Sequence, residues 1–249
     1  MIDDFERRQE QLDALLSPFG IETSDDQRTA LLRHLELVMR KNQVLNLTRI
    51  VDVDDALVRH VVDSLLFLPS VRNYGGTHDG RQRCVDIGSG AGYPGIPLAI
   101  VHSCEMLLVD SVQKKAAALS EFVEELGLGA SVAVSATRAE ELAGARRGHF
   151  DVMTARAVAD LGVLVEYASP LLCRGGVLVA GKARIDDAEL ARGKKTADLV
   201  GMRSVSRETY ELPHGQGHRE ILVFRKTDKS KVRLPRRIGL AKSKPLAGS

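Results

Sequence analysis

Apolar residues in the first third of the chain recur at helical spacing, with polar residues between them. Three such stripes are present, at residues 12–19, 31–39 and 57–66. Pro18–Gly20 ends the first stripe, and Ser24 followed by Gln27 has capping-box spacing just before the second. The third helix is expected to begin near Asp54 and to stop before Pro69. We therefore predict a helical region, followed by a Gly-, Asn- and Asp-rich linker over residues 72–82.

From Arg83 onward the pattern changes to short apolar runs that alternate with amphipathic stretches. Five runs read as buried strands, at Cys84–Ile87, Met106–Val109, Val132–Val134, Val152–Ala155 and Val177–Ala180. Helical patterns between them are clearest at residues 112–126 and 161–172. This alternation indicates an α/β fold with a doubly wound, Rossmann-like parallel sheet. Two further runs, Ser204–Leu212 and Glu220–Phe224, have no helix between them and predict an antiparallel hairpin.

These patterns divide the chain into three parts. We expect an N-terminal helical region over residues 1–82, an α/β domain over 83–226 and a C-terminal tail over 227–249. Eight Lys or Arg and one Asp lie between Lys226 and Ser249, so the net charge of this segment is +7 while the rest of the chain carries −5. A basic tail on an acidic body indicates either a polyanionic partner or a solvated terminus.

The composition gives no sign of a membrane or secreted protein. Of the 249 residues 44% are hydrophobic, but no apolar stretch approaches the ~18 residues that a membrane span needs. The first ten residues are charged and mostly polar and do not resemble a secretory signal. The three cysteines, Cys84, Cys104 and Cys173, are odd in number and widely spaced, which favours buried thiols over disulfides or a zinc site. We expect a cytoplasmic protein without a metal and, because nothing demands a dimer, a monomer.

The strongest local signal is a glycine-rich loop, Asp86-Ile87-Gly88-Ser89-Gly90-Ala91-Gly92-Tyr93-Pro94-Gly95, between a strand and a helix. Glycines let such a turn approach a ligand closely. Gly90, Gly92 and Gly95 match the dinucleotide pattern G-x-G-x-x-G, with Asp110 placed 20 residues after Gly90. The alternative is the pattern Asp-x-Gly-x-Gly-x-Gly, in which the acidic residue ends the first strand.

The negative charge of Asp86 distinguishes between the two candidate ligands of this loop. The carboxylate of Asp86 would repel the two phosphates of a dinucleotide, whereas it tolerates the sulfonium and amino groups of S-adenosylmethionine. The loop therefore favours a class I S-adenosylmethionine methyltransferase over a nicotinamide-dependent oxidoreductase. Asp110 ends the second strand, where it would accept ribose hydroxyls or cap the next helix. Ala139-Glu140 follows the third strand and lies beside the adenine or simply forms a first helical turn.

Several segments together resemble one family, the RsmG or GidB small-subunit rRNA guanine-N7 methyltransferases. The matching segments include Asn46-Leu47-Thr48, Arg59-His60-Val61-Val62-Asp63-Ser64, the loop extended through Gly95-Ile96-Pro97-Leu98, Arg138-Ala139-Glu140-Glu141 and Ala155-Arg156-Ala157. The resemblance implies methyl transfer to N7 of a guanine in the 530 loop of 16S rRNA, guanine 527 in the usual numbering. It implies cofactor contacts at Gly88, Tyr93, Ala139, Glu140 and Arg156. The loop itself adds Asp86 and Gly90, and the end of the second strand adds Asp110. One departure is Gly181, which precedes Lys182 where the family often has glycine after the lysine.

The chemistry of N7 directs the choice of catalytic residues. N7 carries an in-plane lone pair and no proton, so the reaction needs alignment rather than a general base. Arg156, at the end of the fourth strand, is our candidate for positioning the guanine through O6 or a phosphate, and its alternative is an ion pair with Glu166 or Asp160. The face formed by His60, Asp63 and Ser64 either lines the site or forms a hydrogen-bond network between domains.

The RNA-binding surface is the least specific of these expectations. The candidates for contact with 16S rRNA or the 30S subunit are Asn46, Arg59, His60, Lys182, Arg236 and Arg237. Asn46 is equally suited to capping a turn. A non-enzymatic RNA-binding factor with the same fold remains an alternative, although such a protein has no need for a cofactor loop.

Overall fold

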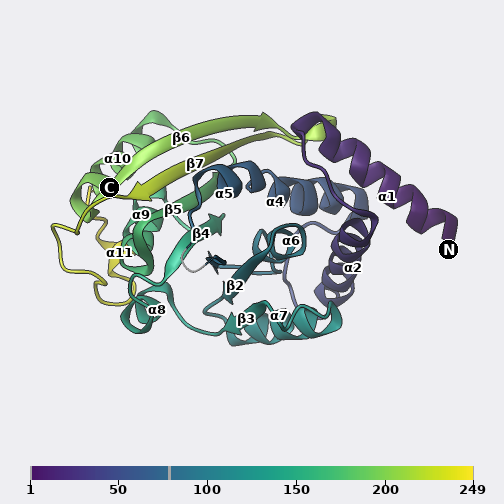
Figure 1. Cartoon of the computed structure of the whole chain (residues 1–249), viewed down its shortest axis with the longest axis horizontal. Helices are drawn as coiled ribbons and strands as arrows, with labels where there is room; N and C mark the ends of the chain where they lie inside the picture. The colour runs from purple at the N-terminus through teal and green to yellow at the C-terminus, as the bar shows by residue number, and fades with distance from the viewer. Residues whose placement is uncertain (1, 78–79, 249) are drawn as a thin grey trace.

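A seven-stranded sheet forms the centre of the computed structural model, which describes residues 2–77 and 80–248 (Figure 1). The strands lie in the order β3-β2-β1-β4-β5-β7-β6. Their bounds are β1 Gln82–Ile87, β2 Cys104–Val109, β3 Val132–Ser135, β4 Phe150–Arg156, β5 Leu172–Lys182, β6 Met202–Glu211 and β7 His218–Lys226. Each predicted strand is present, and the predicted doubly wound α/β fold is confirmed.

Strand direction follows the sequence pattern. β1 to β5 pair in parallel, with Val85 opposite Leu107 and Met153 opposite Leu178. The side chains of the central strands β1 and β4 are almost all buried on both faces, as continuous apolar runs require. β7 lies antiparallel between β5 and β6, which confirms the predicted hairpin. An all-parallel dinucleotide-binding sheet has the order 3-2-1-4-5-6, so the inserted β7 separates this fold from that class.

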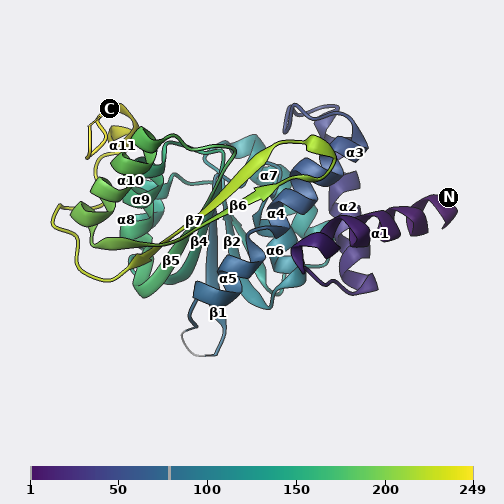
Figure 2. The same cartoon turned by 90° about the horizontal axis from the view of Figure 1, so that it is seen from above.

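Helices cover both faces of the sheet, and Figures 1 and 2 show the two groups on opposite sides. One group holds α8 Ala139–Ala145, α9 Leu161–Leu171, α10 Asp187–Val200 and α11 Leu240–Ser243. The other holds α6 Gly95–Val101, α7 Gln113–Glu125 and the N-terminal helices. Two hydrophobic clusters correspond to the two faces, and the N-terminal helices share theirs with α6, α7 and the sheet. The division of the chain at residues 82 and 226 stays a prediction.

The N-terminal helices are α1 Ile2–Leu16, α2 Asp25–Asn42, α3 Val53–Ala56, α4 Asp63–Leu65 and α5 Leu68–Tyr74, with short helices η1 Ser17–Phe19 and η2 Leu57–Val62. The capping box of α2 is confirmed, because Ser24 Oγ accepts from the amide of Gln27 and the Gln27 side chain accepts from the amide of Ser24. The predicted third helix is α3, η2 and α4 in succession, and η2 has π-helical geometry.

The predicted linker over residues 72–82 is too long at both ends. α5 extends to Tyr74 and β1 begins at Gln82. Pro69 lies in the first turn of α5, where its missing amide costs nothing, so it starts a helix as well as following one. The side chains of Leu68 and Val71 are buried, and this tertiary packing supports a helix that the local sequence only weakly favours.

Gly181 in β5 permits a close approach between the sheet and these helices. A Cβ atom at this position would lie 2.4 Å from Cζ of Phe67, which is fully buried. The ring of Phe67 therefore occupies the space that a side chain would need. This contact is a physical reason for glycine before Lys182, where the sequence departs from the family pattern.

The C-terminal tail packs against the protein rather than extending into solvent. Leu234 and Ala241 are buried in the cluster formed with α8, α9 and α10. Arg236 pairs with Glu166 of α9, and the amide of Gly239 donates to Glu140 of α8 at 2.9 Å. The short η3 Pro213–Gly215 connects β6 to β7. No helix in the described part of the chain is long and apolar enough to span a bilayer.

Candidate active site

A cavity of 310 Å³ opens at the edge of the sheet where the parallel strands end. β1 and β2 contribute Gly88 and Asp110 directly after their last residues. Ala139 and Glu140 come from the first turn of α8, and Ala157 and Val158 from the loop after β4. Ligands of doubly wound folds bind at this edge, so the cavity is the candidate cofactor site.

The glycine loop borders the cavity through Gly88, and its backbone is unusual. Gly88, Gly90 and Gly92 have φ values of 75°, 58° and 93°, which residues with a Cβ rarely adopt. The amides of Gly88 and Ser89 donate to the carbonyl of Val109 at 2.8 and 3.1 Å, which fixes the turn against β2. A Cβ at Gly88 would lie 2.6 Å from Cγ2 of Val158, whereas one at Gly90 would meet nothing closer than 3.9 Å.

Asp86 supports the loop from inside the protein. Its carboxylate is fully buried and accepts hydrogen bonds from Thr154 Oγ1 at 2.8 Å and from the amide of Gly95 at 3.2 Å. Burial raises its pKa, while these hydrogen bonds oppose the rise. Asp86 does not line the cavity. Its observed contacts hold the end of β1, β4 and the start of α6 together.

Asp110 lies in the cavity wall and is 7% exposed. Its two carboxylate oxygens accept from the amides of Gly90 at 3.1 Å and Val112 at 2.9 Å. The second contact is a local turn before α7, whose N-cap is Val112 and has no side-chain cap, so the capping alternative for Asp110 is not observed. A carboxylate offers about four lone-pair sites, so these two bonds leave acceptor capacity unused on a residue that lines the cavity.

Glu140 connects the cavity to the C-terminal tail. Its Oε1 accepts a hydrogen bond from the Gly239 amide at 2.9 Å. Burial and the nearby carboxylate of Glu140 raise the pKa of Tyr167 in α9. Gly239 and Lys242 line the cavity together with Tyr167 and Ala139. The tail therefore forms part of the cavity wall.

Arg156 ends β4 on the other side of the glycine loop. Its Nη1 donates to Asp63 Oδ2 at 3.0 Å and to the carbonyl of Arg59 at 3.1 Å, and its guanidinium carbon lies 5.5 Å from the ring centroid of Tyr93. The alternative for Arg156, an ion pair with Glu166 or Asp160, is wrong, because its carboxylate partner is Asp63. Those carboxylates pair with arginines closer to them, Arg236 and Arg192.

Asp63 also binds a second arginine: Nε of Arg219 in β7 donates a hydrogen bond to the same Oδ2 atom at 3.0 Å. Its neighbours His60 and Ser64 are also engaged within the protein. His60 Nε2 lies 2.8 Å from Thr48 Oγ1, and Ser64 Oγ donates to the carbonyl of His60 at 2.5 Å. The network alternative for this helix face is therefore observed, and it joins the N-terminal helices to β4 and β7.

Tyr93 packs inside a cluster of rings below Arg156. His60 stacks on it at 4.7 Å with an interplanar angle of 12°, and His34 lies 4.6 Å away. His34 Nε2 is 3.0 Å from the carbonyl of Ala91, so this histidine also contacts the loop. Burial lowers the pKa of both histidines to about 3, and the charge of Arg156 contributes at His60. Burial likewise raises the pKa of Tyr93.

The six RNA-binding candidates lie in different environments. Asn46, Arg59 and Arg237 are exposed. The turn near Asn46 is capped by Asn42 instead, whose Oδ1 accepts from the amides of residues 47 and 48. His60 is 8% exposed. The charged group of Lys182 contacts the Ala159 carbonyl and Glu189, both at 2.6 Å, and Arg236 is bound by Glu166.

The structure thus brings the predicted residues together in two groups. Gly88, Asp110, Ala139 and Glu140 line the cavity, while Tyr93 and Arg156 lie beyond the loop with Asp63. Sequence reasoning missed four contributors: Tyr167, Arg219, Gly239 and Lys242. No local pattern identifies them, because they reach the site from distant positions in the chain.

Comparison with known proteins agrees with this geometry. The O-methyltransferase TomG from Streptomyces achromogenes, solved in complex with SAM, superposes with a TM-score of 0.56 over 90% of this chain and 98% of its own, at 16% identity. The [4+2]-cyclase SpnF superposes with a TM-score of 0.55 over 81% and 96%, at 17% identity. At these identities the likeness establishes the fold alone.

Sequence relatives establish the family. The ribosomal RNA small subunit methyltransferase G of Geobacillus thermodenitrificans is 37% identical over 239 residues, which are 95% of this chain and 98% of the relative. The protein of the same name from Deinococcus radiodurans is 38% identical over 217 residues, 86% and 83% of the two chains. The model of the GidB family, rRNA small subunit methyltransferase G, matches residues 27–219. The chain therefore belongs to the GidB family of small-subunit rRNA methyltransferases.

Proposed function

We propose that this chain transfers a methyl group from S-adenosylmethionine to N7 of guanine 527, in the 530 loop of 16S rRNA. The observation that carries the proposal is the cavity between the glycine loop, Asp110 and Glu140 in a chain of this family. A nicotinamide-dependent oxidoreductase fits neither the family nor the inserted antiparallel β7. A purely RNA-binding factor fits poorly, because such a protein has no need for a cavity lined by Gly88, Asp110 and Glu140.

The residues around the cavity fit S-adenosylmethionine. The space in front of Gly90 is open, so a ligand can approach the backbone there. Asp110 keeps free acceptors for the two ribose hydroxyls. Ala139 and Glu140 flank the place proposed for the adenine, and Gly88 that proposed for the amino-acid part. The cofactor supplies an electrophilic methyl group on sulfur.

Arg156 is the proposed positioning residue for the guanine. Its Nη1 is used by Asp63 and the Arg59 carbonyl, which leaves the donors of Nη2 and Nε available. A single donor to O6 orients the base and leaves the N7 lone pair free to attack. Because no proton has to be removed from N7, fixing this orientation is the main task of the protein.

Asp63 and Arg219 position Arg156 rather than contact substrate. Two guanidinium groups share Oδ2 of Asp63, whose side chain is 6% exposed. Such a nearly buried, charge-assisted arrangement restricts the orientation of Arg156. The stacked ring of His60 below Tyr93 supports the same region from within the N-terminal helices.

The exposed residues Asn46, Arg59 and Arg237 are the proposed contacts with rRNA. His60, Lys182 and Arg236 are assigned supporting roles because their side chains are buried or engaged in ion pairs. We propose that the enzyme acts as a monomer, since one chain supplies every residue of the cavity, and that it acts in the cytoplasm, where ribosomal subunits are found.

The test uses 30S subunits from cells that lack this methylation. They are incubated with the protein and methyl-labelled S-adenosylmethionine, and N7-methylguanine is mapped by specific strand cleavage. We expect one cleavage, at guanine 527, which Asp110→Ala strongly reduces through weaker cofactor binding. Label at another nucleotide would contradict the proposed target. Absence of both label and cofactor binding would contradict the proposed reaction.

A further inference from the structure

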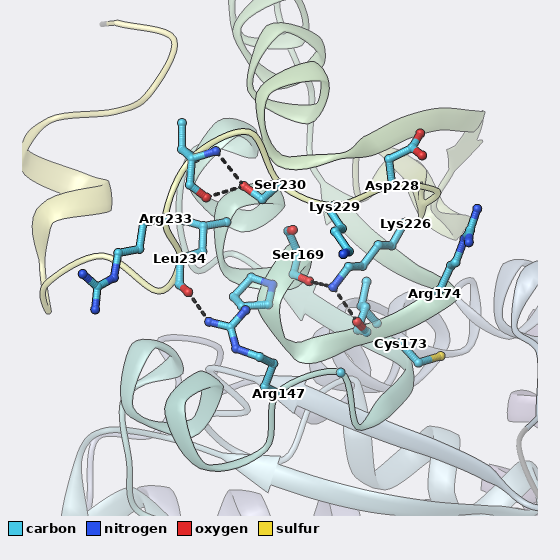
Figure 3. A pocket seen from close by; sticks show the side chains of 14 residues that line it. Arg147, Ser169, Cys173, Arg174, Lys226, Asp228, Lys229, Ser230, Arg233 and Leu234 are labelled. Carbon is cyan, nitrogen blue, oxygen red and sulfur yellow. Dashed lines mark hydrogen bonds between the residues drawn. The ribbon is translucent and has the colours of Figure 1, made fainter.

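A second and larger cavity, of 1020 Å³, lies on the side of the sheet where the parallel strands begin, opposite the cofactor site at their carboxyl ends. Figure 3 shows its walls, which come from three parts of the chain. The first part is the turn before β4, which holds Arg147. The second is the junction of α9 and β5, from Ser169 to Arg174. The third is the end of β7 and the start of the tail, from Lys226 to Leu234. β4 and β5 begin here, whereas the cofactor cavity lies where parallel strands end.

This basic pocket carries five cationic side chains and one carboxylate, Asp228. The cations are Arg147, Arg174, Lys226, Lys229 and Arg233. Within residues 2–77 and 80–248, none of the five forms an ion pair with Asp or Glu. Half-buried arginines elsewhere in the described residues, such as Arg156, Arg219 and Arg236, do have such a partner. The pocket therefore holds positive charge that the protein itself does not neutralise.

Backbone carbonyl groups hold two of the cations in place. Lys226 Nζ donates to the carbonyl of Leu172 at 2.9 Å and to that of Ser169, and Arg147 Nη2 donates to the carbonyl of Leu234. Burial, together with the positive charge of Arg147, lowers the pKa of Lys226. Figure 3 shows Lys229 extending from the tail toward Lys226. An anion placed between these groups would relieve their mutual repulsion.

The lining also indicates which part of an anionic ligand the pocket would recognise. It contains no aromatic side chain on which a base could stack, and Arg147, Arg174, Lys229 and Arg233 are exposed. Such a surface suits phosphodiester groups, which are contacted independently of sequence. Its breadth and exposure favour a polymer backbone over a small enclosed nucleotide.

We propose that the basic pocket binds backbone phosphates of 16S rRNA in the 30S subunit, as a second contact remote from the methylated guanine. The choice of rRNA as the source of these phosphates rests on the proposed function. The pocket and the cofactor cavity lie at opposite edges of the sheet, so the two contacts would fix the enzyme on the subunit from two sides. Affinity for the subunit then depends on this pocket, while the methyl-transfer step does not.

The test compares two matched double variants. Arg147→Gln/Lys229→Gln removes two charges from the pocket, and Lys194→Gln/Lys195→Gln removes two exposed charges from α10. Binding of unmethylated 30S subunits is measured on filters between 50 and 200 mM salt, beside kcat, KM and the Kd for S-adenosylmethionine. For the pocket variant we expect a KM about 10-fold higher at the upper salt concentration and a salt slope reduced by about one to two. kcat and the Kd for the cofactor remain unchanged.

Equal KM and salt slope in the two double variants would overturn the proposal. Inorganic phosphate and AMP serve as small-anion probes. If they bind the wild type but not the pocket variant, and the 30S affinity of that variant is unchanged, the pocket serves a small phosphate ligand and the rRNA assignment is wrong. Filter binding does not require turnover, so a failure of the proposed methylation is distinguishable from a failure of the pocket.

Discussion

Asp63 Oδ2 accepts a hydrogen bond from Arg156 Nη1 at 3.0 Å, between residues 93 positions apart in the sequence. The contact joins the N-terminal helices to the end of β4, at the edge of the sheet where the cofactor cavity opens. Arg219 of β7 approaches the same oxygen, so three separate segments meet at one carboxylate. With the positioning role proposed for Arg156, stability and catalysis are both expected to depend on the side chain of Asp63.

Asp63→Ala is expected to reduce the free energy of unfolding by about 3 kcal/mol, because it leaves two mostly buried guanidinium groups without their counter-charge. Urea denaturation measures this effect. Asp13→Ala is the control, since its ion pair with Arg28 is 58% exposed on the Asp side and is worth less than about 1 kcal/mol. Equal losses in the two variants would show that the Asp63 arrangement is an ordinary surface pair.

Asp63→Asn separates catalysis from folding, because asparagine keeps an acceptor at the same place. We expect kcat to fall about 10- to 100-fold as Arg156 loses its fixed orientation, while the Kd for S-adenosylmethionine stays close to that of the wild type. Initial rates with unmethylated 30S subunits and equilibrium dialysis of the cofactor give the two values. An unchanged kcat would remove Arg156 positioning from the mechanism.

The glycine loop shows what sequence can predict well. The short apolar run, the glycines and Asp86 form a contiguous pattern, and the structure places the loop between β1 and α6 as that pattern predicts. The role of Asp86 was harder to predict from the sequence. Its carboxylate is directed at Thr154 and the Gly95 amide rather than at the cavity, and a partner 68 residues away leaves no local signal.

Side-chain contacts that form only when distant segments pack together could not be predicted from the sequence. Asp63 was singled out by its helical spacing from His60, but its pairing with Arg156 depends on how the N-terminal helices dock on the sheet. The basic tail likewise suggested an arm for RNA. Its actual place, with Arg236 on Glu166 and Gly239 on Glu140, depends on surfaces of α8 and α9 that charge counting does not reveal.

Gly88→Ala is expected to weaken cofactor binding far more than Gly90→Ala. Both positions have positive φ, which costs alanine on the order of 1 kcal/mol, but only the Gly88 Cβ would overlap Val158, at 2.6 Å. The Kd for S-adenosylmethionine, measured by calorimetry, reports the displacement of the loop. In Gly88→Ala/Val158→Ala the overlap is removed, and we expect a large part of the affinity to return. Equal effects of the two single variants would show that overlap is unimportant.

Truncation of the tail tests its place in the cavity wall. A chain that ends at Arg237 keeps the Arg236–Glu166 ion pair but loses Gly239 and Lys242, so we expect the Kd for S-adenosylmethionine to rise about 5- to 10-fold. A chain that ends at Lys244 keeps both residues and should bind the cofactor as the full chain does. If both truncated chains bind equally well, the tail does not contribute to the cofactor site.

The buried histidines predict how stability depends on pH. The pKa of His34 and of His60 is about 3 in the folded protein, below the ordinary 6.5, so the unfolded chain binds protons there that the folded chain does not. Stability therefore falls as the pH decreases below 6.5, by up to about 1.4 kcal/mol per pH unit for each histidine, and this loss ends near pH 3.

His60→Gln retains a hydrogen-bonding group for Thr48 but does not titrate. Urea denaturation between pH 7 and 4 should give a shallower decline for this variant, whereas the exposed His214→Asn should follow the wild type. A decline identical to that of the wild type in His60→Gln would mean that its imidazole stays accessible to protons in the folded protein.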